Sequence, residues 1–408
     1  MNKPIPARVR VDGPLERYRD GFGQELSSRG YASSPAAGHL QLMGHLSRWL
    51  DHHGLEPGEL AATRVEQFLE DRRAAGRVHR CLTLGGVSPL LDYLRALGVV
   101  PAPQPPVPVD PLELLVADFA DYLVNERGLA KPTVANYRSV AKAFLSACSR
   151  ESSRDGLAVG GLAAEDVTGF VLAQAQRRSH GSLNNVATGL RALLRFLYVS
   201  GHTATSLDTA VPTAPGWRDR GIPRAAGPDQ VFRLLASCDR RTSRGRRDFA
   251  ILMLLARLGL RAAEVAALDV KDIAWRAGVL VVTGKGNRRE QLPLPHDVGQ
   301  AIADYCQRGR RRGDCHRLFL RGSAPYTGLS ASGIREVVAR RCTRAGLERM
   351  GAHRLRHAAA TAMRRSGAPL LEIGQALRHR HVATTAHYAR DDHDAMGLVA
   401  RPWAGGLA

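Results

Sequence analysis

The sequence predicts a mainly α-helical protein with a small antiparallel β-sheet in its C-terminal domain, an α+β organisation. Three observations lead to this prediction. Apolar residues recur at helical spacing through most of the chain. The pattern changes at 278–294, where two strand-like runs flank the turn TGKGN. Two segments rich in proline and glycine, 101–111 and 202–227, interrupt the helical pattern and indicate domain boundaries.

A chain of 408 residues is long enough for two to three domains, each with its own core. Proline fixes φ and lacks an amide donor, so the segment PAPQPPVPVDP is expected to be an extended, semi-rigid linker. We therefore expect a helical module at 1–100, a linker at 101–111, a second helical module at 112–201, a second linker at 202–227, a C-terminal domain at 228–392 and a tail at 393–408.

The two helical modules resemble each other in sequence. RGYA at 29–32 matches RGLA at 127–130, and further pairs follow at offsets that rise to 103. The pairs are Val65 with Val167, Phe68 with Phe170, Leu94 with Leu197 and Gly98 with Gly201. The sequence thus predicts an internal duplication of one four-helix module, with a small insertion near residue 151. The alternative is a chance likeness between two small helical bundles.

The chain is strongly basic, with a net charge of +20. Residues 201–408 carry 35 basic and 18 acidic side chains, so most of the surplus lies in the C-terminal half. A GC-rich coding bias would explain arginine in place of lysine, but not the surplus over acids. A polyanion is therefore the expected partner, and nucleic acid is the first candidate.

Other features exclude several classes of protein. The six cysteines are scattered without a CxxC pair, so neither a zinc ribbon nor a redox motif is expected. The N-terminal residues lack an apolar signal core, and the longest apolar run, 249–256, is too short to span a bilayer. We therefore expect no membrane partner and a cytoplasmic, nucleoid-associated location.

The stretch 351–392 holds five histidines, many arginines and a single tyrosine, Tyr388. His353 and Arg356 are three residues apart, which places them on one face of a helix where both can bind the same anion. The planar guanidinium of arginine matches phosphate oxygens. We hypothesise that Tyr388 is a nucleophile toward a DNA phosphate. The alternatives are an ordinary core aromatic and, for the histidines, a metal site, although no HExxH spacing supports the latter.

Two charged positions upstream fit the same hypothesis. Arg261 follows an apolar helix and a glycine, and Glu264, three residues further on, could orient it. Lys285 lies between two glycines at the tip of the predicted hairpin. A lysine there can move toward a bound phosphate and donate a proton.

Four stretches together resemble the tyrosine recombinase (phage integrase) family. They are LGLRAAEVAAL around Arg261, TGKGNRR around Lys285, HRLRH at 353–357, and LRH at 377–379 followed by Tyr388. The resemblance covers 225–392 strongly, and 112–201 is more loosely similar to the family's helical (SAM-like) core-binding domain. Residues 1–100 would be a second such module. In one departure, Arg378 stands where the family usually has glycine.

The resemblance implies a site-specific DNA recombinase of integrase or transposase type, which needs no metal or other cofactor. Tyr388 would attack the scissile phosphodiester, form a 3′-phosphotyrosyl link and release a 5′-hydroxyl. Arg261 and Arg356 would stabilise the charge on the non-bridging oxygens, and Lys285 would protonate the leaving oxygen.

The family's histidine positions complete the implied site. His353 would act as an acid or base for the tyrosine proton, and His379 would donate a hydrogen bond to the phosphate. Glu264 and His357 would support the site.

The expected partners are double-stranded DNA and further copies of the chain, a tetramer in the synaptic complex, with other recombinase subunits as further candidates. The apolar residues of the tail suit docking on a neighbouring protomer. Basic side chains expected to face the DNA are Arg244, Arg246, Arg247, Arg288, Arg289, Arg310, Arg311, Arg354 and Arg378.

Three other functions stay open at the level of sequence. The first is a type IB topoisomerase-like enzyme with the same tyrosine chemistry but no exchange of partners. The second is a DNA-binding protein whose site is disabled by Arg378, and the third is a metal-dependent nuclease. The residues do not distinguish integration, excision, transposition and resolution.

Overall fold

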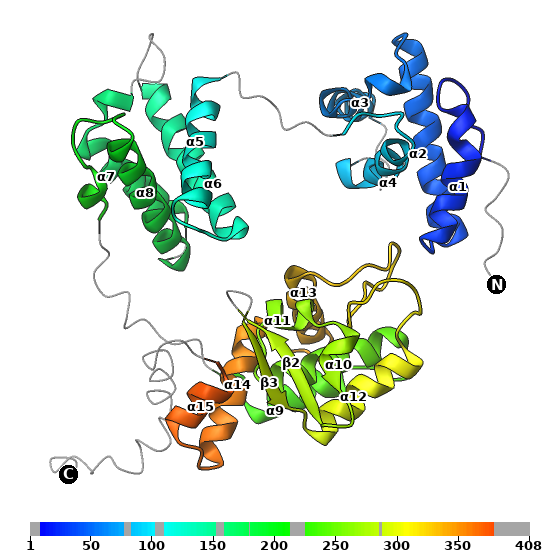
Figure 1. Cartoon of the computed structure of the whole chain (residues 1–408), viewed down its shortest axis with the longest axis vertical. Helices are drawn as coiled ribbons and strands as arrows, with labels where there is room; N and C mark the ends of the chain where they lie inside the picture. The colour runs from blue at the N-terminus through cyan, green and yellow to red at the C-terminus, as the bar shows by residue number, and fades with distance from the viewer. Residues whose placement is uncertain are drawn as a thin grey trace, which may run out of the picture. The chain divides into compact units, whose positions relative to one another are not determined.

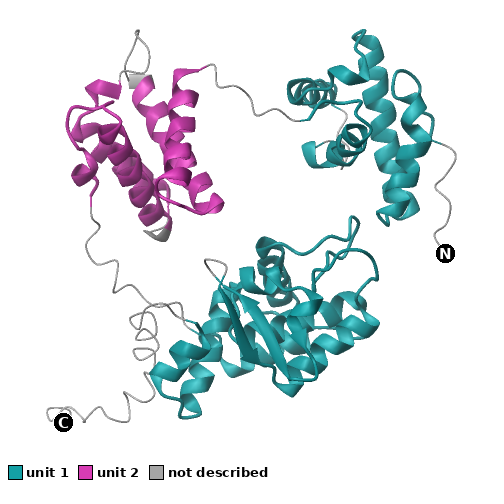
Figure 2. Cartoon of the chain, viewed as in Figure 1, with its two compact units in different colours: residues 1–102, 221–408 teal, residues 103–220 magenta. Residues whose placement is uncertain are grey.

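A computed structural model describes residues 9–76, 83–102, 110–151, 159–178, 180–212, 225–284 and 288–378. Contacts divide the chain into two compact units, residues 1–102 with 221–408, and residues 103–220 (Figure 2). None of the helices in the described ranges combines the length and the apolar character that a membrane span requires.

The N-terminal part of the first unit is a helical bundle (Figure 1). Its α-helices are α1 (Arg19–Ser28), α2 (Ser33–His52), α3 (Ala62–Ala74) and α4 (Leu84–Ala96). Each helix buries one apolar face, as its sequence pattern predicts, and the faces meet in one hydrophobic cluster. Phe22, Leu46 and Phe68 are fully buried in this cluster.

The second unit repeats this plan with α5 (Pro111–Asn125), α6 (Lys131–Glu151), α7 (Ala164–Arg177) and α8 (His180–Val199). Asp110 caps α5 by accepting a hydrogen bond from the amide of Leu112 at 3.1 Å. Leu207 and Val211 pack against the hydrophobic cluster of this unit. The start of the predicted 202–227 linker therefore belongs to the second bundle, because Val211 is buried there and Leu207 is half-buried.

The two bundles share their helix ends as well as their helix order. A glycine with positive φ follows the first helix of each bundle, Gly30 (φ +81°) and Gly128 (φ +58°). Another follows the fourth helix of each, Gly98 (φ +72°) and Gly201 (φ +74°). Glycine is favoured at such helix ends because it adopts positive φ without steric cost. These matched positions support the proposed duplication.

The C-terminal part of the first unit combines helices with a small sheet (Figure 1). Its α-helices are α9 (Pro228–Ala236), α10 (Ser243–Arg257), α11 (Ala262–Ala267), α12 (His296–Arg308), α13 (Ala331–Arg344), α14 (Ala352–Arg365) and α15 (Leu370–Ala376). Its strands are β1 (Ile273–Ala274), β2 (Val279–Thr283) and β3 (Arg289–Pro293).

The three strands form an antiparallel sheet in the order β1-β2-β3. Leu280 and Val282 alternate with half-buried residues along β2 and enter the main hydrophobic cluster, as the period of a strand requires. Residues 250–255 of α10 are almost wholly buried in the same cluster, so α10 is the central helix of this domain.

The fold class predicted from the sequence is confirmed, with two local differences. Strand β1 escaped prediction because a two-residue strand carries no periodic signal. Helix α10 begins at Ser243, six residues before the apolar run at 249–256 that marks it in the sequence. Its first turn is polar and is capped by Thr242, whose hydroxyl accepts from the Gly245 amide at 3.0 Å.

Candidate active site

Three of the six predicted catalytic residues lie in the described part of the chain, namely Arg261, His353 and Arg356. Lys285, His379 and Tyr388 lie outside the described residues. The described part of the site consists of the residues that surround the two arginines.

Arg356 lies in the first half of α14 and connects two distant turns. Its Nη1 donates to the carbonyl oxygen of Gly259 at 2.5 Å, and its Nη2 donates to the carbonyl oxygen of Leu377. The residue is 1% exposed. Buried charge is costly unless it is hydrogen-bonded, and backbone carbonyls meet that requirement here. Arg356 thus joins α14 to the turn after α10 and to the end of α15.

Two features favour glycine at position 259. Its φ of +60° disfavours side chains, and an added Cβ would lie 2.5 Å from Cδ2 of Leu377. The close approach brings the turn before Arg261 against the end of α15. This explains the glycine that stands two residues before Arg261 in the sequence.

Arg261 is the N-cap residue of α11 and is held by a buried carboxylate. Glu264 accepts from the Arg261 amide at 2.8 Å and from Arg261 Nη1 at 2.7 Å. The Glu264 side chain is 4% exposed, whereas that of Arg261 is 43% exposed. The structure therefore places the orienting contact that the sequence suggested and leaves the Arg261 guanidinium accessible.

Arg378 follows α15 and reaches the same carboxylate. It was predicted to contact DNA, but its side chain is 5% exposed and its Nη2 donates to Glu264 at 2.8 Å. Its φ is +57°, a region in which glycine is favoured. The family's usual glycine thus has a backbone explanation, and the DNA contact is replaced by a buried ion pair. Sequence reasoning missed this pair, for which the unusual residue was the only signal.

The pKa of Glu264 is below its usual range. Burial favours the protonated carboxyl and opposes this shift, but the guanidinium of Arg378 and the hydrogen bonds and charge of Arg261 outweigh burial. Glu264 is therefore a carboxylate at neutral pH and can hold both arginines.

His353 lies on α14 one turn before Arg356. Partial desolvation of the ring lowers its pKa below 6.5, although the residue as a whole is exposed, and the positive charges of Arg356 and Arg261 lower it further. The His353 ring packs edge to face against the ring of buried His357, with 4.6 Å between the ring centroids. His353 is therefore a neutral imidazole at neutral pH, close to both arginine charges.

The remaining predicted DNA-facing arginines divide by their surroundings. Arg244, Arg288, Arg289 and Arg311 are exposed. Arg289 pairs with Asp272 at 3.4 Å and Arg311 lies over the ring of Tyr326 at 4.4 Å. Exposed arginines such as these can reach a DNA backbone.

Three others are more enclosed. Arg246 pairs with Asp304 at 3.3 Å and its side chain is 17% exposed. Arg310 donates to the carbonyl oxygens of Arg317 and Leu318 and so holds the loop after α12. Arg354 is half-buried.

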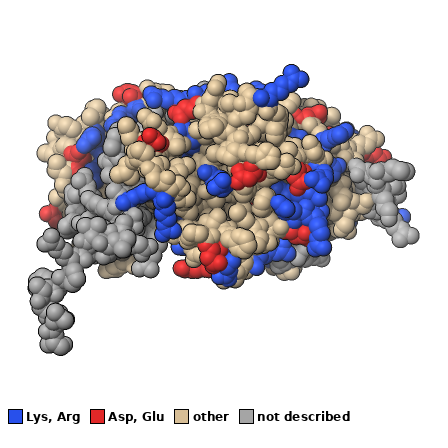
Figure 3. Space-filling model, turned by 90° about the horizontal axis from the view of Figure 1, so that it is seen from below, with Lys and Arg blue, Asp and Glu red and all other residues tan. Residues whose placement is uncertain are grey.

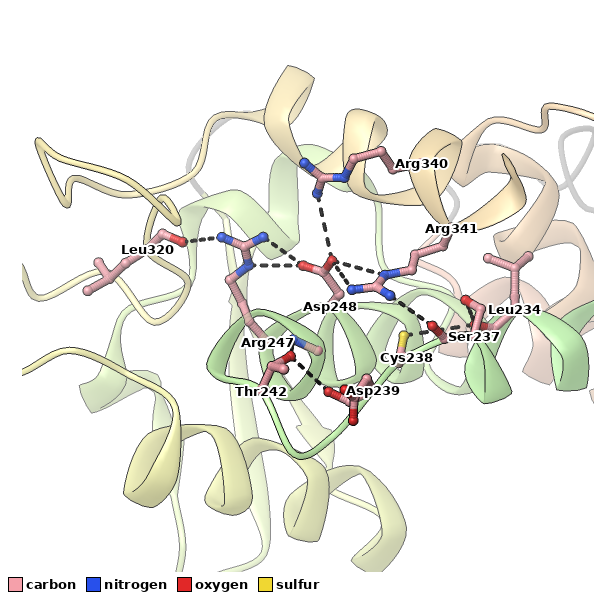
Figure 4. Close-up of polar contacts among 11 residues, drawn as sticks. Leu234, Ser237, Cys238, Asp239, Thr242, Arg247, Asp248, Leu320, Arg340 and Arg341 are labelled. Atoms are coloured by element: carbon pink, nitrogen blue, oxygen red, sulfur yellow. Dashed lines mark hydrogen bonds and ion pairs between the residues drawn. The ribbon is translucent and has the colours of Figure 1, made fainter. Parts of the chain in front are cut away.

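Arg247 is buried in an ion-pair cluster and not available to DNA in this structure (Figure 4). Its Nε and Nη2 donate to one oxygen of Asp248 at 3.0 and 2.7 Å, and Nη1 donates to the Leu320 carbonyl at 2.9 Å. Arg341 donates to the other Asp248 oxygen at 3.0 and 2.7 Å. Asp248 is fully buried, so it needs both guanidinium groups. The predicted DNA contact of Arg247 is thus replaced by a structural role.

The surface charge is mixed. On the face shown in Figure 3, Lys and Arg side chains lie among Asp and Glu side chains. Candidate DNA contacts therefore have to be assigned residue by residue, from exposure and ion pairing.

Comparisons with known proteins agree on one family. Residues 226–394 match the phage integrase family. The chain is 38% identical over 399 residues to "Putative integrase/recombinase y4rA" of Sinorhizobium fredii (strain NBRC 101917 / NGR234), covering 97% of this chain and 96% of that protein. It is 27% identical over 279 residues to tyrosine recombinase XerD of Listeria monocytogenes serotype 4b (strain F2365), covering 67% and 93%.

Solved structures share the fold. A lambda integrase (75–356) dimer bound to a COC′ core site matches with a TM-score of 0.54 at 17% identity, over 72% of this chain and 99% of that chain. The XerH site-specific recombinase bound to palindromic difH substrate, a post-cleavage complex, matches with a TM-score of 0.54 at 16% identity, over 72% and 97%.

Proposed function

The chain belongs to the phage integrase family of tyrosine recombinases, and on this basis we propose that it is a site-specific DNA recombinase that cuts and rejoins strands through a 3′-phosphotyrosyl intermediate. One observation carries the proposal. The hydrogen bond from Arg356 to Gly259 brings α14 beside the turn that leads to Arg261. As a result, two arginines that are far apart in sequence both lie close enough to His353 for their charges to act on it. Paired guanidinium groups suit the charge of a phosphoryl transition state.

In the proposed step, the Tyr388 oxygen attacks the scissile phosphorus. The bond between this phosphorus and the 5′ oxygen of the next nucleotide breaks. The tyrosine proton passes to His353, whose neutral imidazole can accept it. Lys285 donates a proton to the leaving 5′ oxygen. A 5′-hydroxyl from a second strand then attacks the phosphotyrosine, so the bond energy is retained and no nucleotide cofactor is consumed.

The other predicted residues act around this step. Arg261 is accessible and binds a non-bridging oxygen, while Glu264 holds it in place. Arg356 braces the turns at Gly259 and Leu377, and its positive charge, which acts on His353, stabilises the same phosphate. His379 donates a hydrogen bond to the phosphate, and His357 supports the ring of His353.

The partner in this proposal is double-stranded DNA, and the location is wherever the chromosome lies, the cytoplasm and nucleoid of a bacterial cell. The lambda integrase neighbour is a dimer on a core site, and another structural neighbour is a Tn1549 transposon integrase in complex with circular intermediate DNA. We extend this to a tetramer that synapses two duplexes, with the tail at 393–408 docking on a neighbouring protomer, and to a role in the movement of a genetic element.

The two helical bundles are proposed to be copies of one core-binding module. The second bundle occupies the place of the core-binding domain and contacts the duplex. Deletion of residues 1–105 tests the role of the first bundle. If the DNA footprint of the protein shrinks at one edge after this deletion, the first bundle also contacts DNA.

The central experiment looks for a covalent adduct. The full chain is incubated in EDTA with a pool of nicked suicide duplexes that carry randomised arms. Protein-linked DNA is isolated under denaturing conditions and sequenced. A recombinase yields an adduct enriched in one sequence, and Tyr388→Phe abolishes it. The absence of an adduct in the wild-type protein would overturn the proposed function.

Two controls separate the alternatives. Inhibition of cleavage by EDTA would indicate a metal-dependent nuclease. Relaxation of supercoiled plasmid that lacks the selected sequence would indicate a topoisomerase-like enzyme.

A further inference from the structure

The dipeptide Leu377-Arg378 is linked to both arginines of the proposed site. Arg356 donates to the carbonyl oxygen of Leu377. Arg378 donates to Oε2 of Glu264 at 2.8 Å, and Oε1 of the same carboxylate accepts from Arg261 at 2.7 Å. These contacts span 114 residues from Glu264 to Arg378. The end of α15 is thus tied to α11 and to α14 together.

Arg378 adopts a backbone conformation that carries a cost for its residue type. Its φ of +57° is the left-handed region, where a Cβ approaches the following carbonyl. Its amide donates to the Gln375 carbonyl at 2.9 Å, so the position is the one after a helix end where glycine is preferred. The side chain is ordered by two contacts, to the Ala376 carbonyl at 3.1 Å and to Glu264. The ion pair offsets a cost that glycine would avoid.

The charge balance shows what the side chain adds. Glu264 alone would neutralise Arg261, because the two form a one-to-one ion pair. Arg378 supplies a second buried cation to the same carboxylate, so the three residues together carry one net positive charge. Glu290 lies 3.9 Å from Nε of Arg378, but its side chain is 46% exposed, so water screens its charge.

We propose that Arg378 is a positioning residue for strand cleavage, which holds Glu264 in place and offsets its negative charge so that Arg261 presents a fixed, positive guanidinium to the phosphate. This inference rests on the proposed recombinase function. It assigns a role to the one position at which the sequence departs from the family's motif, and it opposes the view that Arg378 disables the site.

The test compares Arg378→Gln, Arg378→Gly and Arg378→Lys in the full chain. Cleavage of the selected suicide duplex is followed in single turnover at saturating protein, and DNA affinity is measured separately. Gln keeps a side chain at positive φ without charge, Gly restores the preferred backbone without charge, and Lys keeps the charge. Arg349→Gln is the matched control, because it removes an exposed arginine that pairs with Glu336 at 4.0 Å.

We expect Gln and Gly to slow cleavage by about tenfold to a hundredfold, as misplacement of a catalytic group does, with little change in Kd. Lys should restore most of the rate, and Arg349→Gln should cleave like the wild type. Wild-type cleavage by the Gln and Gly variants would overturn the proposal. A loss of affinity that parallels the loss of rate would also overturn it, since Arg378 would then be a DNA contact.

A double-mutant cycle shows whether Arg378 acts through Glu264. Glu264→Gln alone should slow cleavage, and adding Arg378→Gln should slow it little further. Fully additive effects would contradict the proposed route. The double variant also leaves no unpaired buried charge, so it tests the idea even where Arg378→Gln folds poorly. If the wild-type chain forms no adduct, the recombinase function itself fails; if it does and the variants match it, only the role of Arg378 fails.

Discussion

Nη1 of Arg356 donates a hydrogen bond to the carbonyl oxygen of Gly259 at 2.5 Å, across 97 residues of sequence. The same turn lies against Leu377, whose carbonyl accepts the second Arg356 contact. One arginine therefore brings together the turn before α11 and the end of α15. The geometry of the proposed site depends on this backbone contact as much as on the side chains that carry the chemistry.

Gly259→Ala should disrupt the packing of the Gly259 turn against Leu377. The new Cβ would lie 2.5 Å from Leu377 at a positive φ, so the substitution costs about 1–2 kcal/mol in backbone energy and about 1–3 kcal/mol in overpacking. Gly278→Ala is the matched control, because Gly278 has φ +63° and nothing within 4 Å of its added Cβ. The losses of stability of the two variants, measured by thermal unfolding, should differ by the packing cost. Equal losses would show that the Leu377 side chain moves aside without cost.

His353 should titrate below 6.5, because desolvation and the charges of Arg356 and Arg261 disfavour its protonated form. The neutral base then persists to pH values below 6.5, and the cleavage rate should fall only at lower pH. His353→Gln should remove this acidic limb. Folding stability follows the same sign: the unfolded chain binds the proton more readily, so His353 destabilises the fold as pH falls below 6.5. An NMR titration midpoint of 6.5 or higher would contradict the assignment.

Asp248→Asn should destabilise the C-terminal domain by about 3–5 kcal/mol, because it leaves the buried guanidinium groups of Arg247 and Arg341 without their counter-charge. Asp297→Asn is the control. Asp297 pairs with Arg257 at 3.0 Å, but both side chains are about half exposed, so its loss should cost about 1 kcal/mol or less. Hydrogen exchange of the α10 amides measures the loss of stability in each variant. Equal losses would show that burial does not decide the cost of removing an ion-pair partner.

Arg288 and Arg247 should respond differently when DNA binding is measured. Arg288 is exposed, so Arg288→Gln should weaken binding to any sequence and lower the slope of log K against log salt concentration by about one unit. Arg247→Gln should leave the slope unchanged and lower the melting temperature, because Arg247 is 4% exposed and pairs with Asp248. A reduced slope for Arg247→Gln would place this side chain on the DNA.

Much of this protein is encoded locally and can be predicted from the sequence. Apolar periodicity marks the helices of both bundles, and the change of period near 278 marks the sheet, because these signals depend on neighbours along the chain. The motifs around Arg261 and Arg356 indicate the family in the same way, and the comparisons confirm it. The contact between Glu264 and Arg261 could also be predicted from the sequence, because the two residues are three positions apart, which is about one helical turn.

Only the tertiary structure decided which arginines face solvent and which are buried. Arg247 and Arg378 look like phosphate contacts in a basic sequence, yet each pairs with a buried carboxylate, Asp248 and Glu264. In the case of Arg378 the partner is 114 residues away. Burial and long-range pairing depend on how α10, α11 and α15 pack, and helical spacing carries no information on that packing. The arginine that seemed to disrupt a family motif is, in the fold, the second cation on the carboxylate that holds Arg261.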